Sequence, residues 1–111
     1  MPHFRFRAIS PEQTQQLSKP LVDALQEQMG CARGDFTIEH IPTTFFSEGE
    51  PAAAWPFIEI FCFDRGQVVQ DEIAARVTSL VREVMNVPEQ DVAVVFIHFR
   101  PENYYDNGVH Y

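Results

Sequence analysis

The stretch PFIEIFCF, residues 56–63, predicts a β-strand that is apolar on both faces. Successive side chains of a strand point to opposite faces, so its residues divide into two alternating sets. These sets are Phe57, Phe61 and Phe63 on one side, and Ile58, Ile60 and Cys62 on the other. Glu59 is the one charge, and if buried it needs a partner, for which Arg5 or Arg7 is the natural choice. A strand of this composition is expected to be covered on both faces.

The beginning of the chain follows the same plan. Pro2 and Ser10 are eight positions apart, as are Pro56 and Asp64, and each pair encloses a strand that leads to a helix start. Two later spacings also agree. Gly30 and Phe36 are as far apart as Asn86 and Val92, and Phe46 and Gly49 are as far apart as Tyr105 and Gly108. The chain therefore contains two similar units.

The first unit is predicted to begin with a strand and a helix. Residues 4–9 alternate apolar and charged side chains, as a half-buried strand does. Ser10 then caps a helix, with Pro11 at its first position and Gln13 closing a capping box. Pro20 is expected to kink or break this helix. Its narrow apolar stripe consists of Leu17, Leu21, Leu25 and Met29.

The rest of the chain completes the first unit and repeats it. Gly30 is expected to end the first helix, residues 36–41 to form a strand, and residues 42–55 to be turn and connection. After the strand at 56–63, Asp64 is expected to cap the second helix. The apolar stripe of that helix is Val69, Ile73, Val77, Leu80 and Val84.

The end of the second unit supplies the last strand. Asn86 is expected to stop the second helix, residues 92–99 to form a strand, and residues 104–108 to form a turn. A helix that joins two neighbouring strands makes them parallel and lies on one face of their sheet. Two such units predict an α/β (α+β) fold with a four-stranded mixed sheet and both helices on one face.

The length of the chain, 111 residues, predicts a single domain over 1–111, with repeat units at approximately 2–51 and 56–108. Two helices cover only one face of the sheet, yet the strand at 56–63 is apolar on both. Another copy of the chain is the simplest cover for the second face. The pattern therefore predicts an obligate oligomer.

The charge of the chain excludes several classes of partner. A net charge of −8 and a pI near 4.8 argue against binding to nucleic acid or to an anionic membrane surface. No apolar run reaches the length of a membrane span, and no signal-peptide core follows Met1. Two well-separated cysteines favour a reduced, cytoplasmic setting. The four histidines lack metal-ligand spacing and no glycine-rich phosphate loop is present, so neither a metal nor a cofactor is predicted.

Pro2 is the main candidate for chemistry. A small second residue of this kind normally permits removal of Met1. The exposed secondary amine would have a pKa close to neutrality, because an N-terminal amine titrates near 7.7–8.0 and burial or nearby cations lower that value. Such an amine can remove a proton from the carbon next to a carbonyl. While Met1 is retained the nitrogen is an amide and cannot act as a base.

The combination of Met1-Pro2 opening a strand, a doubled β-α-β unit and about 110 residues resembles the tautomerase superfamily. That superfamily includes 4-oxalocrotonate tautomerase and macrophage migration inhibitory factor. The sequence segments 1–7, 63–67 and 103–108 look like those of an uncharacterised bacterial branch of the same fold. The resemblance implies a homotrimer with a site between subunits, Pro2 as general base, and a small keto- or enol-acid as substrate.

The resemblance also implies residues that bind the substrate carboxylate. Arg65 stands where some members place binding arginines, although pairing with Asp64 or another acid in solvent is an equally good interpretation. Arg33 is near the place of a lysine in migration inhibitory factor, but not in register. Tyr104 is a further candidate, with packing as its alternative role. If Met1 is retained, the alternative function is a non-catalytic oligomer that uses the fold to bind a ligand or partner.

Overall fold

Two pairs of parallel strands, joined side by side, make the sheet. In the computed structural model, which describes residues 1–111, β1 (Pro2–Arg7) is parallel to β2 (Thr37–His40). Likewise β5 (Phe57–Phe63) is parallel to β6 (Ala93–Phe99). Antiparallel pairing of β1 with β5 at the centre gives the strand order β2-β1-β5-β6. The predicted four-stranded mixed sheet is confirmed.

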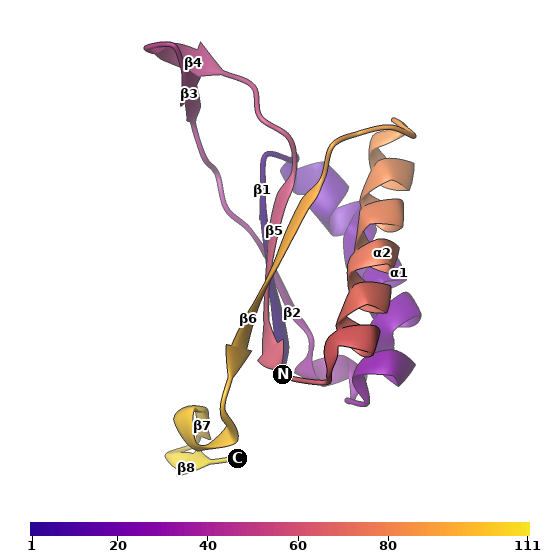
Figure 1. Ribbon diagram of the computed structural model, residues 1–111, viewed down its shortest axis with the longest axis vertical. Coiled ribbons are helices and arrows are strands. Elements are labelled where there is room, and N and C mark those ends of the chain that lie inside the picture. Colours follow the sequence, from indigo (N-terminus) through magenta and orange to yellow (C-terminus); the bar gives the residue numbers. More distant parts are fainter.

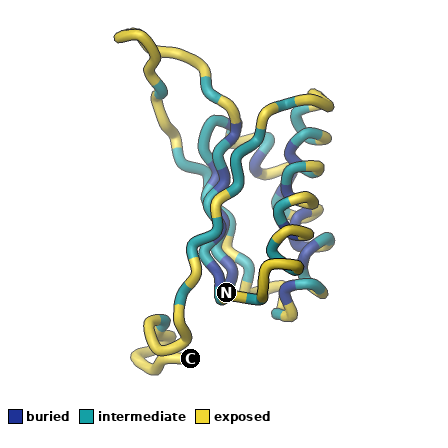
Figure 2. The backbone as a smooth tube through the Cα atoms, viewed as in Figure 1, coloured by how far each residue is buried: buried dark blue, intermediate teal, exposed yellow.

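Both helices lie on the same face of this sheet (Figure 1). They are α1 (Pro11–Met29) and α2 (Gln67–Met85), and the core fills the space between them and the strands (Figure 2). The even-numbered side chains of β1 and β5 point into this core, where Phe4, Phe6 and Ile60 are completely buried. Neither helix is long and apolar enough to cross a membrane.

The first helix has the predicted ends but not the predicted break. Ser10 accepts from the Gln13 backbone N–H, the Gln13 side chain accepts from the Ser10 N–H, and Gly30 ends the helix with a φ of 63°. The helix is continuous through Pro20 because that residue is on the exposed side, while the buried stripe holds both halves against the sheet. The preceding strand ends at Arg7, two residues early, since Ala8 has a φ of 59°.

The start of the second helix differs from the prediction. Asp64 does not cap the second helix. Its carboxylate accepts a hydrogen bond from the backbone N–H of Gly66, two residues later, at 2.8 Å. The helix then begins at Gln67, with Gly66 at φ 86° preceding it. Asn86 ends the helix with a φ of 55°, as predicted. Its buried residues are Ile73, Val77 and Val81.

Two short hairpins extend from the sheet. The segment predicted as turn and connection contains β3 (Phe45–Ser47) and β4 (Glu50–Ala52), so that prediction was incomplete. The turn predicted at 104–108 is confirmed, flanked by β7 (Tyr105–Asp106) and β8 (Val109–His110). Their turns, Glu48-Gly49 and Asn107-Gly108, all have positive φ, as two-residue hairpin loops require. The hairpins lie beyond opposite ends of the sheet, which makes the molecule 45 × 28 × 26 Å (Figure 1).

The second face of the sheet is open and divides into a charged half and an apolar half. On the charged half, Glu59 contacts Arg7 and, at 3.9 Å, Arg5, which confirms the expected pairing. Arg5 also bonds Glu39 of β2 at 2.9 Å. The apolar half consists of Phe57, Phe61, Phe63, Ala93, Val95, Ile97 and Phe99. Tyr104 and Tyr111 cover the end of this face at Phe63 and Phe99, and cover of the rest by a second copy stays a prediction.

Candidate functional site

Pro2 begins the central strand at the end of the sheet where β5 and β6 finish. Its cross-strand partner is Cys62, and its side chain is fully buried on the helix side. The N-terminus lies beside the connection from β5 to α2 (Figure 1). A residue at this position is held by the sheet on both sides, because β1 pairs with β2 and with β5. The nitrogen of Pro2 therefore has a rigid support.

Arg65 is fixed at the same end of the molecule by two backbone carbonyls. Its Nε donates to Met29 O at 2.9 Å and its Nη1 donates to Phe63 O at 3.0 Å. These bonds tie the end of α1 to the end of β5. The predicted alternative, an ion pair with Asp64, is absent, because the Asp64 carboxylate bonds Gly66 instead. Arg65 is half-buried and faces no carboxylate within salt-bridge distance.

Aromatic rings form a wall beyond this end of the sheet. Tyr104 packs on Phe63 with ring centroids 5.7 Å apart and on Phe99 at 5.8 Å. Tyr111, which the sequence analysis did not single out, packs on Tyr104 at 5.0 Å. Its hydroxyl donates to Asp106 at 2.8 Å. Tyr111 reaches the wall because its backbone N–H donates to Tyr104 O. No sequence motif predicts this hydrogen bond.

Both tyrosine hydroxyls in this wall are proton donors at neutral pH. Burial and the nearby Asp106 carboxylate raise the pKa of Tyr104. The hydrogen bond to Asp106 and burial raise the pKa of Tyr111. A phenol that stays protonated can donate a hydrogen bond to a carbonyl or enolate oxygen. The Tyr111 hydroxyl donates to Asp106, and the same carboxylate is also a hydrogen-bonding neighbour of the Tyr104 hydroxyl.

The surroundings of the two cysteines make their thiols unreactive. Burial raises the pKa of the Cys62 thiol, and the Arg65 guanidinium offsets only part of that increase. Burial likewise raises the pKa of Cys31, which follows the end of α1. Since the thiolate is the nucleophilic form, neither thiol is favoured for chemistry at neutral pH. Across the whole chain, no three His, Cys, Asp or Glu side chains are arranged to hold a metal ion.

Arg33 is not directed to the site. It precedes β2 in the short 3-10 helix η1 (Arg33–Asp35), but its guanidinium bonds the Asp23 carboxylate of α1 at 2.8 Å. The structure thus brings Pro2, Arg65 and Tyr104 to one end of the sheet and leaves Arg33 in an exposed ion pair.

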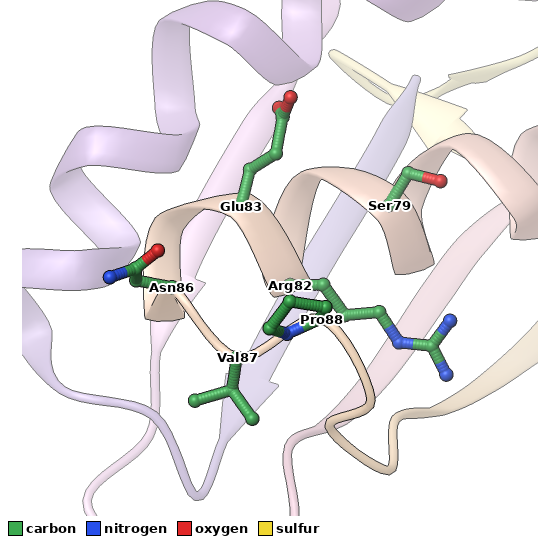
Figure 3. A pocket seen from close by; sticks show the side chains of 6 residues that line it. All are labelled: Ser79, Arg82, Glu83, Asn86, Val87 and Pro88. Carbon is green, nitrogen blue, oxygen red and sulfur yellow. The ribbon is translucent and has the colours of Figure 1, made fainter.

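The single chain has several open grooves, and one of about 530 Å³ lies at the end of α1, lined by Asp23, Gln26, Glu27, Gly30, Cys31 and Ala32. A groove of about 410 Å³ follows the end of α2, where Arg82 and Glu83 point away from each other (Figure 3). An apolar groove of about 490 Å³ lies against the β3–β4 hairpin, lined by Trp55 and Phe57 among others. The space beside Cys62 and Arg65 is only about 10 Å³. One copy of the chain therefore has candidate chemical groups at Pro2, but Pro2 itself lines none of these cavities.

The fold is that of the tautomerase superfamily. A macrophage migration inhibitory factor-like protein from Entamoeba histolytica superposes with a TM-score of 0.74 at 14% identity, covering 99% of this chain and 98% of that one. A native fused 4-OT superposes with a TM-score of 0.79 at 13% identity, covering 97% and 94%. At these identities the similarity concerns the fold alone.

Within that fold the chain belongs to a particular family. The model of the domain of unknown function DUF1904 matches residues 1–110, and the chain is a member of this family. A DUF1904 crystal structure from Sebaldella termitidis is 33% identical, with a TM-score of 0.90 and full coverage of both chains. A protein of unknown function from Vibrio cholerae is 35% identical, with a TM-score of 0.89, covering 99% of this chain and 87% of that one. No curated protein sequence matches significantly.

Proposed function

We propose that the protein is a tautomerase in which Pro2, freed by removal of Met1, moves a proton at the carbon next to a carbonyl. The observation that carries the proposal is the position of Pro2, fully buried at the start of a central strand, at the same end of the sheet as Arg65, whose charge meets no carboxylate. An amine held there is shielded from water, which disfavours its protonated form.

The reaction is a proton shift within one small keto- or enol-acid. The neutral Pro2 amine takes the α-proton, and the electrons of the broken C–H bond form an enolate. The Tyr104 hydroxyl donates a hydrogen bond to the developing oxyanion. The protonated amine then returns the proton to another carbon or to the oxygen. The Nη2 group of Arg65, which makes neither of its two backbone bonds, attracts the substrate carboxylate.

We further propose that the site is completed between the subunits of a homotrimer. The open sheet face carries half-buried aromatic side chains, and the Val95 side chain there is 38% exposed. A fused 4-OT of the same fold, at 16% identity, is described as an asymmetric trimer. Assembly would supply the walls that one copy lacks around Pro2. The two free cysteines favour a reducing, cytoplasmic setting for this assembly.

The test combines intact mass with turnover. Protein from its own host is expected to lack Met1 and to interconvert the enol and keto forms of phenylpyruvate or 2-hydroxymuconate. Two variants remove the base, namely Pro2→Ala and a chain extended before Pro2 so that its nitrogen stays an amide. The turnover rate of each should fall about 100-fold or more, which is the usual contribution of a general base. Unchanged turnover in the extended chain would refute the mechanism. A host protein that retains Met1 would favour the non-catalytic oligomer.

A trapping reagent gives a second test. A protein of the same fold, at 16% identity, is described as inactivated by 2-oxo-3-pentynoate. We expect the wild-type protein to gain one adduct of this reagent, and peptide mapping to place it on Pro2. The extended chain is the matched control and should gain none.

A further inference from the structure

The loop of the β7–β8 hairpin contains an asparagine that differs chemically from the others in the chain. The chain has three asparagines, and Asn86 and Asn103 are followed by valine and tyrosine. Asn107 is followed by Gly108, which has no side chain to hinder attack by its backbone nitrogen. All three asparagines are exposed to solvent, so the following residue is what distinguishes them. The side-chain amide of Asn107 is therefore the one open to attack by a neighbouring backbone nitrogen.

The hairpin that holds this loop is short and exposed. β7 and β8 are two residues long, and their pairs are Tyr105 with His110 and Asp106 with Val109. These four residues are all exposed. Segments with few buried contacts open locally at a low cost in free energy. The loop can therefore leave its folded turn without unfolding of the sheet.

The first repeat unit shows that this kind of turn does not need an asparagine. Its hairpin loop is Glu48-Gly49, with φ values of 52° and 78°. Asn107 and Gly108 have φ values of 52° and 81°, so the two loops have the same φ pattern. A glutamate has no side-chain amide and cannot release ammonia. The second loop thus carries a reactive group that its backbone conformation does not require.

We propose that Asn107 is a site of spontaneous deamidation that changes how the aromatic wall is held. The Gly108 nitrogen loses its proton to base and attacks the side-chain carbonyl carbon of Asn107, so that a C–N bond forms. The bond from that carbon to the amide nitrogen breaks, and ammonia leaves after taking up the proton. Water then adds to either carbonyl of the cyclic imide. Release of the Gly108 nitrogen from the side-chain carbon gives aspartate, and release from the main-chain carbon gives a β-linked aspartate.

The β-linked product affects the residues that the hairpin holds. A two-residue loop fixes the register of its two strands, and the β-linkage lengthens the backbone of that loop. β8 leads directly to Tyr111, whose hydroxyl donates to Asp106 at 2.8 Å and whose N–H donates to Tyr104 O at 3.1 Å. A change of register moves Tyr111 away from both acceptors and from the Phe63 ring, 5.3 Å away between centroids. Deamidation therefore loosens the wall at this end of the sheet.

The experiment follows the full chain during incubation in mildly alkaline buffer. Intact mass should rise by the difference between an amide and an acid. Peptide mapping should place the change at Asn107 in most molecules, while Asn86 and Asn103 stay unchanged in nearly all. In the purified β-linked product, the NMR cross-peaks between the Tyr111 and Phe63 rings should be lost. Equal deamidation of all three asparagines, or none at Asn107, would overturn the site, and retained cross-peaks would overturn its effect on the wall.

Asn107→Gln is the matched control. Glutamine retains an uncharged amide, but its attack would have to close a larger ring, which is far slower. The variant should keep its mass and its Tyr111–Phe63 cross-peaks through the same incubation. If it lost these cross-peaks as fast as the wild-type protein, the loosening would have another cause and the inference would be wrong. None of these measurements depends on turnover, so the result is independent of the role proposed for Pro2.

Discussion

Glu59→Gln should destabilise the protein measurably, although it changes only one charge. Glu59 is the acid shared by Arg7 and Arg5 on the open sheet face, and its side chain is 17% exposed. The substitution retains the shape and the hydrogen-bonding capacity of the side chain but leaves the Arg7 guanidinium, 25% exposed, without its counter-charge.

The expected size of the effect follows from this intermediate burial. Removal of one partner from a fully buried ion pair costs about 3–5 kcal/mol, and an exposed pair is worth about 1 kcal/mol or less. We therefore expect Glu59→Gln to lower the free energy of unfolding by about 2 kcal/mol. For a chain of this length the loss corresponds to a decrease in Tm of roughly 8 °C.

Glu39→Gln is the matched comparison. Glu39 is on the same face and bonds Arg5 at 2.9 Å, but its side chain is 45% exposed. Its loss should cost about 0.5 kcal/mol. Urea unfolding followed by circular dichroism, at several protein concentrations to separate assembly from folding, gives both values. If Glu39→Gln lowered the free energy of unfolding as much as Glu59→Gln or more, burial would not explain the stability that Glu59 contributes.

Two further predictions concern the core and the cysteines. Leu21→Ala, at a fully buried position of α1, should cost about 3 kcal/mol in urea unfolding, whereas Leu80→Ala, at a half-buried position of α2, should cost clearly less; equal costs would contradict the described core. The raised thiol pKa values of Cys62 and Cys31 mean fewer thiolates at any pH below them, so native protein at pH 8 should react with iodoacetamide far more slowly than unfolded protein. Peptide mapping by mass spectrometry should find Cys31, the less buried residue, modified first; early modification of Cys62 would contradict its burial.

The architecture was predictable because it is repeated in the sequence. Strand alternation, the stripe from Leu17 to Met29 and the stop at Gly30 are local signals, and each occurs again in the second unit. Local signals failed where another local bond competed. Asp64 has the chemistry of a helix cap, yet it bonds the N–H of Gly66, the residue that precedes the first residue of the helix. Pro20 removes one hydrogen bond but not the packing that keeps its helix continuous.

The candidate site was predictable only as a set of residue types. The sequence by itself determined the doubled β-α-β plan, the two-faced strand and the position of Pro2 at the start of a strand, since these depend on periodicity and capping within a few residues. The tertiary structure decided which arginine lies at the same end of the sheet as Pro2. Arg65 is drawn to the Met29 carbonyl, 36 residues away in sequence, and Arg33 is drawn to Asp23. It also placed Tyr111 beside Tyr104. Hydrogen-bond partners at such separations depend on how the elements pack, and no spacing along the chain encodes them.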